Sequence, residues 1–209
     1  MFRKYVALVL SMLLLTPLGV VAEEGAQPWI ESVKADQHSS TSRFLVEEYM
    51  YRLPQNEGYK HEVWLVSTAD ASKRMLLYTH QRNVRVVLSP DDRWLIINNE
   101  FASNESNLLL FRQKKGIKFE EVKDDIANGA WNFLAKKEKK APCLDHNYAE
   151  VLRWTDDHTV LICLSGHLDS KNHVQDWLCL YDVTTKTFST DFDANNKRHV
   201  VVEPGKTSL

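Results

Sequence analysis

Short hydrophobic runs separated by polar turns characterise the chain from residue 43 onward. The runs are rich in Val, Ile, Trp, Tyr and Phe, which suit the pleated, half-buried surface of a β-sheet. They predict strands at 43–52, 61–67, 74–79, 83–88, 93–99, 107–112, 117–122, 148–154, 158–165, 176–182, 186–190 and 198–203. The pattern therefore predicts an all-β protein built from short antiparallel strands.

One segment, 124–140, departs from the strand pattern and can be helical. Asp124 or Asp125 can cap its start, and lysines gather at its end, where the helix dipole favours positive charge. Apolar residues within it recur at helical spacing, and Pro142 lies just beyond it. We expect one short inserted helix near 125–137.

The chain contains an internal repeat. Residues 84–98 align with residues 149–163 without a gap, and in both copies an Asp-Asp pair stands between two apolar strands. Each hairpin is followed by a third apolar strand and then a more polar fourth one. An earlier, incomplete copy can be traced over 43–79. The repeat predicts four-stranded units stacked along the chain.

The Asp-Asp pairs are interpreted as turn residues. Pro90 fixes its own φ angle and suits the entry to a turn. The side chains of Asp91 and Asp156 can accept hydrogen bonds from backbone N–H groups two residues further on. Asp92 and Asp157 stand where a left-handed backbone is expected, which Asp tolerates better than most residues.

These two hairpins resemble a known family. The stretch SPDDRWL beginning at Ser89 is similar to the WD-like β-propeller repeat of the TolB type, whose hairpin reads S-P-D-G-x-x-hydrophobic. The stretch WTDDHTV beginning at Trp154 is a weaker copy, and both have Asp where the family has Gly. The resemblance implies propeller-like antiparallel blades in a single domain, 43–209, after an irregular lead-in, 23–42.

The length of the chain limits the number of blades. At roughly 40–45 residues per blade, the 187 residues that follow residue 22 (209 minus 22) hold at most about four. Two complete units and a partial third can be read, so we expect about three blades and an incomplete ring. The exposed ends of such a stack need cover, which favours a bound partner or a homodimer.

The N-terminus predicts export. Residues 1–22 read as a signal peptide, with Arg3 and Lys4 before an apolar run and small residues before a cleavage point after Ala22. We expect a periplasmic or secreted protein whose mature form does not span a membrane. Cleavage would leave 24 basic residues (26 minus 2) against 28 acidic ones, and this negative balance argues against nucleic acid as a partner.

Export permits disulfides, and the chain has three cysteines. If the hairpin turns symmetrically about 166–176, Cys163 faces Cys179 across two strands, which suits a bridge. Two alternatives remain open: two buried free thiols, or a bridge from Cys143 to either residue.

Catalytic chemistry has little support in the sequence. There is no G-x-S-x-G nucleophile elbow and no glycine-rich phosphate loop, and no cofactor is expected. His167, Asp169 and His173 form the one His/Asp cluster. Their spacing matches no regular zinc pattern, so a solvated hairpin loop is favoured over a metal site.

We therefore expect an exported, non-catalytic binding or scaffold protein whose partner is a cell-envelope protein or peptide, with a glycan as the next choice. The loops 54–60, 101–106 and 166–175 join second and third strands and are the expected binding surface. Two tryptophans, Trp131 and Trp154, can also line a recognition surface. The candidate binding residues are Gln55, Asn56, Glu57, Tyr59, Asn104, Glu105, His167, Asp169 and His173.

Three alternative functions stay open. The protein can be an inhibitor or accessory subunit of a secreted hydrolase, or a structural domain that contributes edge strands to an assembly. It can also be a metal-dependent enzyme that uses the 167–173 loop.

Overall fold

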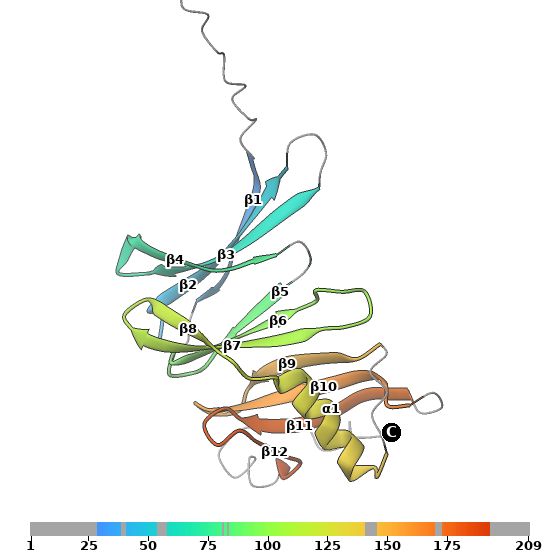
Figure 1. Cartoon of the computed structure of the whole chain (residues 1–209). Coiled ribbons are helices and arrows are strands. Elements are labelled where there is room, and N and C mark those ends of the chain that lie inside the picture. The colour runs from blue at the N-terminus through green and yellow to red at the C-terminus, as the bar shows by residue number, and fades with distance from the viewer. Residues whose placement is uncertain are drawn as a thin grey trace, which may run out of the picture.

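A computed structural model describes residues 29–38, 41–53, 58–80, 82, 84–140, 146–169 and 173–192, with side chains from residue 41 onward. Within these residues the chain forms three antiparallel sheets and one short helix (Figure 1). The mostly-β prediction with a single inserted helix is confirmed.

Each sheet is a four-stranded meander in which neighbouring strands are consecutive in the chain. Sheet 1 contains β1 (Trp29–His38), β2 (Phe44–Arg52), β3 (Tyr59–Ser67) and β4 (Asp70–His80). Sheet 2 contains β5 (Val84–Leu88), β6 (Trp94–Asn99), β7 (Asn107–Lys115) and β8 (Lys118–Val122). Sheet 3 contains β9 (Tyr148–Trp154), β10 (Thr159–His167), β11 (His173–Asp182) and β12 (Thr187–Ser189).

The predicted strands agree with the observed ones, with one addition at the N-terminal end. Residues 29–38, expected as part of an irregular lead-in, form β1, so the lead-in prediction is wrong for this stretch. The strand pairs antiparallel with β2 along its whole length, and the register shifts twice. The strand predicted at 198–203 and the signal peptide lie outside the described residues.

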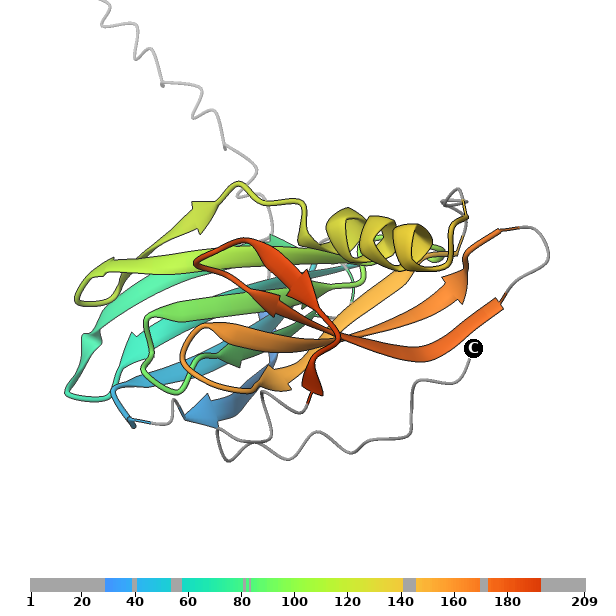
Figure 2. The same cartoon turned by 90° about the horizontal axis from the view of Figure 1, so that it is seen from below.

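The three sheets stack face to face, with sheet 2 in the middle (Figures 1 and 2). Alternate residues of β6 point to opposite sides: Leu95 and Ile97 pack with the core of sheet 1, and Ile96 packs with that of sheet 3. Sheet 2 is therefore buried on both faces. This explains the uninterrupted apolar runs at the start of β6 and in the first half of β7.

Helix α1 (Ile126–Lys137) covers one edge of the stack, as Figure 2 shows. The Asp125 side chain caps the helix by accepting from the Asn128 backbone N–H at 3.4 Å, and basic residues occupy the last turn. Trp131 and Leu134 are buried in the core shared by sheets 2 and 3. The helix thus seals the apolar layer between these two sheets.

The turn predictions hold for three of the four aspartates. Asp91 Oδ1 accepts from the Arg93 N–H at 3.0 Å, and Asp156 Oδ1 accepts from the His158 N–H at 2.9 Å. Asp92 has a φ of 59°, in the left-handed region. The prediction of a left-handed backbone is wrong for Asp157, whose φ is not positive.

The second turn differs because it is one residue shorter. Leu88 pairs with Leu95 in the first hairpin, whereas Trp154 pairs with Val160 in the second. A bulge in β9 at Leu152 takes up the difference, so that the two hairpins return to the same register beyond it. The alignment of the two copies without a gap is therefore correct for the strands beyond the bulge and wrong by one residue at the turn.

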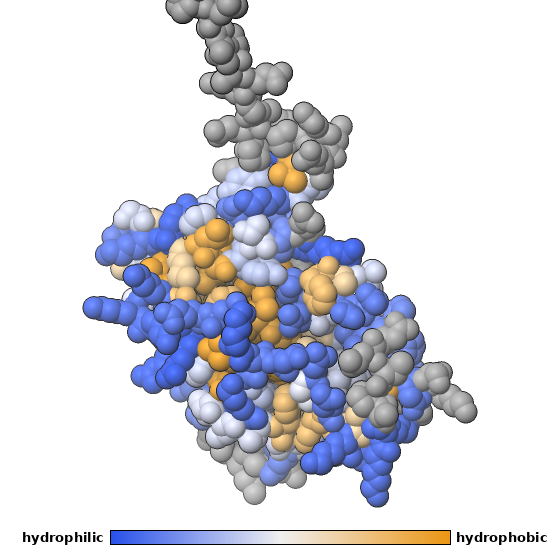
Figure 3. Space-filling model, in the orientation of Figure 1, coloured by the Kyte–Doolittle hydropathy of each residue, from blue (hydrophilic) through white to orange (hydrophobic). Residues whose placement is uncertain are grey.

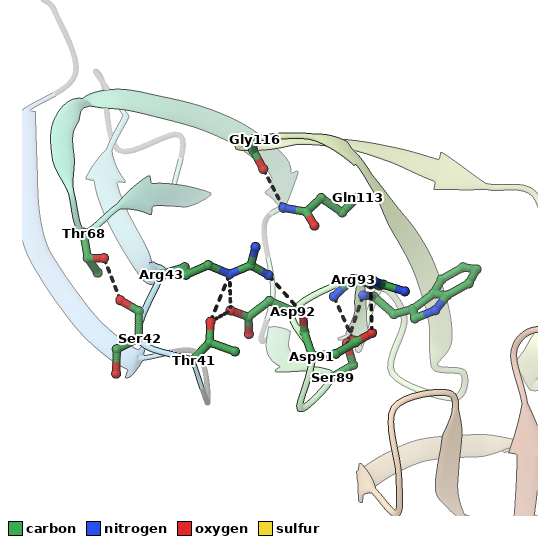
Figure 4. A network of polar contacts seen from close by, with 11 residues as sticks. Thr41, Ser42, Arg43, Thr68, Ser89, Asp91, Asp92, Arg93, Gln113 and Gly116 are labelled. Atoms are coloured by element: carbon green, nitrogen blue, oxygen red, sulfur yellow. Dashed lines mark hydrogen bonds and ion pairs between the residues drawn. The ribbon is translucent and has the colours of Figure 1, made fainter.

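The first Asp-Asp turn is fastened to sheet 1 (Figure 4). Arg43 Nε lies 3.3 Å from Asp92 Oδ2, and Arg43 Nη2 donates to the Asp91 carbonyl oxygen at 3.0 Å. The Thr41 hydroxyl also donates to Asp92. Asp92 is fully buried, and these contacts replace water at Oδ2, whereas Oδ1 has no hydrogen-bond partner among the described residues. Asp92 therefore has a structural role in the turn, as the sequence predicted.

The predicted disulfide between Cys163 and Cys179 is wrong. Cys163 pairs with Leu178, one residue away from the expected register. The hairpin closes with Gly166 opposite Val174 rather than residue 176, and a shift between Leu164 and Gly166 then places Cys163 opposite Leu178. The two thiols therefore point to opposite faces of sheet 3, and both are free. Cys143 lies outside the described residues.

In the view of Figure 3, hydrophobic residues surface in a band between sheets 1 and 2, with hydrophilic residues on either side. The band coincides with the apolar layer of those sheets. Within the described part of the chain, none of the helices is long and apolar enough to cross a membrane.

Candidate functional site

The ends of β2, β6 and β10 lie on one side of the stack, on the right in Figure 1. The three loops predicted as a binding surface start at these ends. Gln55, Asn56 and Glu57 fall outside the described residues, and Tyr59 is exposed at the start of β3.

Three histidines meet at the end of sheet 3. His167 lies opposite His173 in the β10–β11 ladder, with ring centroids 5.3 Å apart, and His146 contacts His167 at 5.6 Å. Asp169 is half-buried just after β10. The metal candidate His167, Asp169 and His173 is not assembled: within the described residues, the three-ligand group with atoms within 4.8 Å of one another lies in sheet 1.

A cavity of about 390 Å³ lies beside the β6–β7 loop, beneath the first turns of α1. Phe101 and Glu105 come from the loop, Trp131 from the helix and Asn147 from the residue before β9. The cavity therefore joins parts of sheets 2 and 3 with the helix that bridges them.

Backbone hydrogen bonds hold the loop against sheet 3. The Asn147 N–H donates to the Asn104 carbonyl oxygen at 3.0 Å, and the Ser106 N–H donates to the Asn147 carbonyl oxygen at 3.3 Å. Glu105 and Asn147 thus form an isolated parallel bridge. Of the predicted binding residues, Asn104 holds the loop in place by accepting this hydrogen bond at its backbone carbonyl. Glu105 lines the cavity.

Two residues that line the cavity carry buried polar atoms without hydrogen-bond partners among the described residues. The Asn147 side chain is buried, and neither its Nδ2 nor its Oδ1 has a hydrogen-bond partner among the described residues. The same holds for Nε1 of Trp131, which is 1% exposed. Each such group costs about 1–3 kcal/mol, and native proteins contain few of them. Three such atoms belong to two lining residues of one cavity, which makes this cavity the candidate binding site.

Asn98, on β6, shows what a buried asparagine does in this fold. Its Nδ2 donates to the Val151 carbonyl oxygen, and its Oδ1 accepts from the Val151 N–H, both at 2.9 Å. One side-chain amide thereby binds both polar groups of a single backbone residue. The amide of Asn147 offers the same donor and acceptor.

The lining combines an aromatic side chain with acidic groups. Phe101 is 49% exposed and offers an aromatic face at the rim, where Glu105 and Asp125 add negative charge. The Ser106 hydroxyl is already engaged, donating to the Ala149 carbonyl oxygen at 2.8 Å and accepting from the Ala149 N–H at 2.7 Å. None of the lining residues is a histidine, cysteine, lysine or arginine.

A second cavity, of about 370 Å³, is lined by residues of sheets 2 and 3, among them Cys163. Burial, aided by the negative charges of Asp176 and Glu150, raises the pKa of the Cys163 thiol to about 11. The group is therefore a neutral thiol at neutral pH and a poor nucleophile. Arg85 and Glu150 form an ion pair at 3.0 Å in the same wall.

Of the two tryptophans expected at a recognition surface, Trp131 lines the cavity, although it is buried. Trp154 is buried, and its Nε1 donates to the Val87 carbonyl oxygen at 3.0 Å. Sequence reasoning missed Asn147 and Phe101. In the sequence, only their positions pointed to these two residues, because Phe101 begins a predicted loop and Asn147 precedes a predicted strand.

No model of a known protein family matches the chain, and comparison with curated proteins returns no match.

Proposed function

We propose that the protein is an exported, non-catalytic binding protein whose cavity at Phe101, Trp131 and Asn147 takes an extended segment of a cell-envelope protein. The observation that carries the proposal is the Asn147 amide, which is buried with no partner for either polar atom among the described residues. Export rests on the signal-like residues 1–22.

An extended peptide is the ligand whose chemistry fits best. Its backbone presents N–H and C=O groups side by side, which is what the amide of Asn98 already binds in this fold. Phe101 can pack against a side chain of the peptide, and the indole N–H of Trp131 can donate to a second carbonyl. The acidic rim favours a segment that carries positive charge.

The TolB-type resemblance supports the same reading. Three stacked four-stranded meanders, with the S-P-D-D turn between the first two strands of sheet 2, are what a partial propeller of that type contains. In propellers, the loops that join second and third strands gather on one face, which suits partner binding. Membership in this family is part of the proposal.

The variant Asn147→Leu tests the role of the amide. Leucine is similar in size and removes both unpartnered polar atoms, so we expect the free energy of unfolding to stay level or to rise by about 1–2 kcal/mol. The backbone bonds of residue 147 remain available. If chemical denaturation instead shows a loss of several kcal/mol, Asn147 has a structural role and the proposal is wrong.

Binding is measured with a photo-crosslinking benzoylphenylalanine at position 101 in cells of the source organism. We expect one dominant adduct with an envelope protein, and its loss when Asn147→Leu is added. The same crosslinker at Leu76, which is 41% exposed on sheet 1, is the matched control. Identical adducts from both positions, or an adduct that survives Asn147→Leu, would refute the proposed site.

A further inference from the structure

A second polar cluster lies on sheet 1, away from the proposed binding cavity. Glu48 on β2, His61 on β3 and His80 on β4 each offer one ligand atom, and these atoms all lie within 4.8 Å of one another. His61 pairs directly with His80 in the β3–β4 ladder, and their rings stack at 4.9 Å. The fold thus brings together three residues that are 13 and 19 positions apart (48 to 61, and 61 to 80).

The tautomer of His80 is set by its backbone partner. Its Nδ1 forms a hydrogen bond with the Arg82 carbonyl oxygen, and a carbonyl can only accept. Nδ1 therefore carries the proton, and Nε2 presents a lone pair toward Glu48. A histidine that donates one ring N–H to a carbonyl while the other nitrogen stays free is the arrangement found in metal-binding histidines.

The Nε2 atom of His80 is buried and unpaired within the described structure. The side chain is 3% exposed, and Nε2 has no hydrogen-bond partner among the described residues. Glu48 Oε1 is 3.7 Å away, beyond hydrogen-bond distance.

We propose that Glu48, His61 and His80 form a binding site for a divalent transition metal of the zinc class. Two imidazoles and one carboxylate make a ligand set that zinc accepts, with a fourth position left for water or another ligand. Ligand atoms across a tetrahedral zinc ion lie about 3.4 Å apart. Glu48 Oε1 lies 3.1 Å from His61 Nδ1 and 3.7 Å from His80 Nε2, on either side of that value.

Neighbouring groups hold the ligands in place. Tyr78 stacks on His80 with ring centroids 6.0 Å apart, and its hydroxyl accepts from Asn99 Nδ2 at 2.9 Å. Glu48 and His61 remain partly exposed, so an ion can reach them from solvent. In the metal-free state His61 Nδ1 contacts the Glu48 carboxylate, and binding displaces any proton held between these two atoms.

The test uses the purified protein and zinc alone. We expect about one zinc ion per chain by titration calorimetry and elemental analysis after dialysis. The variants Glu48→Gln and His61→Gln should each weaken zinc affinity by at least about 100-fold. His167→Asn is the matched control, since it changes the other histidine cluster and should leave zinc affinity unchanged.

A second measurement needs no variant and so does not depend on folding. Nitrogen NMR of the wild-type protein should show that zinc shifts the Nε2 signal of His80 and the Nδ1 signal of His61, while the His167 and His173 signals stay in place. Absence of binding, or zinc that shifts the His167 and His173 signals instead, would overturn the proposal. The outcome is independent of partner binding at Asn147.

Discussion

Asp92 combines a left-handed backbone with a buried carboxylate, two features that rarely occur in one residue. Its φ of 59° is a conformation that glycine adopts without strain. Here the carboxylate accepts from Thr41 and pairs with Arg43, both just before β2 of the neighbouring sheet. An aspartate at this position therefore adds a contact between sheets 1 and 2.

We predict that Asp92→Gly lowers stability even though glycine suits the backbone. Hydrogen bonds to a charged group contribute about 1.5–3 kcal/mol, whereas relief at a left-handed position is worth about 1 kcal/mol. Urea denaturation should show a net loss of about 1–2 kcal/mol. Arg93→Ala, which removes a largely exposed partner of Asp91, is the control and should change little. A stabilised Asp92→Gly variant would mean that the Arg43 contact contributes almost nothing.

Among the secondary-structure elements, the strands could be predicted from the sequence, but the register between paired strands could not. The alternation of apolar residues marks β6 and β10 because each side chain must match a face of its sheet. This alternation does not show where a strand has a bulge. The bulges at Leu152 and near Gly166 decide which residues of paired strands face each other. The disulfide prediction failed because Gly166 pairs with Val174 rather than residue 176, and the one-residue shift between Leu164 and Gly166 then leaves Cys163 and Cys179 on opposite faces.

Strand β1 was missed for a different physical reason. Edge strands are held by the hydrogen bonds of one neighbour, and their own apolar pattern can be weak. Residues 29–38 pair along β2, and only that pairing reveals the strand. The candidate sites were equally out of reach, because Asn147, Trp131 and Phe101, like the sheet 1 histidines, come together only through the order of the strands.

Gly166 connects strand geometry to the binding cavity. It has a φ of 142°, and an added Cβ would lie 1.8 Å from the His146 carbonyl oxygen, next to Asn147. We predict that Gly166→Ala lowers the free energy of unfolding by about 3 kcal/mol, because backbone must move. Gly116→Ala is the matched control: φ is 57° and no atom lies within 4 Å, so a loss of about 1 kcal/mol is expected. Equal losses in thermal or urea denaturation would show that the close approach is unimportant.

At the scale of the whole molecule, the three sheets form a stack in which sheets 1 and 3 each have one neighbour. Repeat proteins of this kind depend on contacts between adjacent units, and their end units must cover their outer faces. On the outer face of sheet 1, the Arg74 guanidinium lies 4.4 Å above the Trp64 ring and 5.2 Å from the Tyr49 ring. A charged group thereby covers aromatic surface that an inner sheet would bury.

Two adjacent asparagines at the end of β6 join the middle sheet to both neighbours. Asn98 binds the backbone of Val151 in sheet 3, and Asn99 donates to the Tyr78 hydroxyl of sheet 1 at 2.9 Å. Both are buried, so removal of either leaves a polar group without a partner. Because successive residues of a strand point to opposite faces, the pair fastens both interfaces at one place.

We predict that Asn98→Leu and Asn99→Leu weaken different halves of the molecule. Asn98→Leu leaves the Val151 N–H unpartnered and should lower the free energy of unfolding by about 2–3 kcal/mol, with faster hydrogen exchange in β9–β11. Asn99→Leu, which removes a single hydrogen bond, should cost about 1 kcal/mol and speed exchange in β2–β4. Each variant is the control for the other. If both accelerate exchange equally in all three sheets, the stack unfolds as one cooperative unit and the contacts between neighbouring sheets do not act separately.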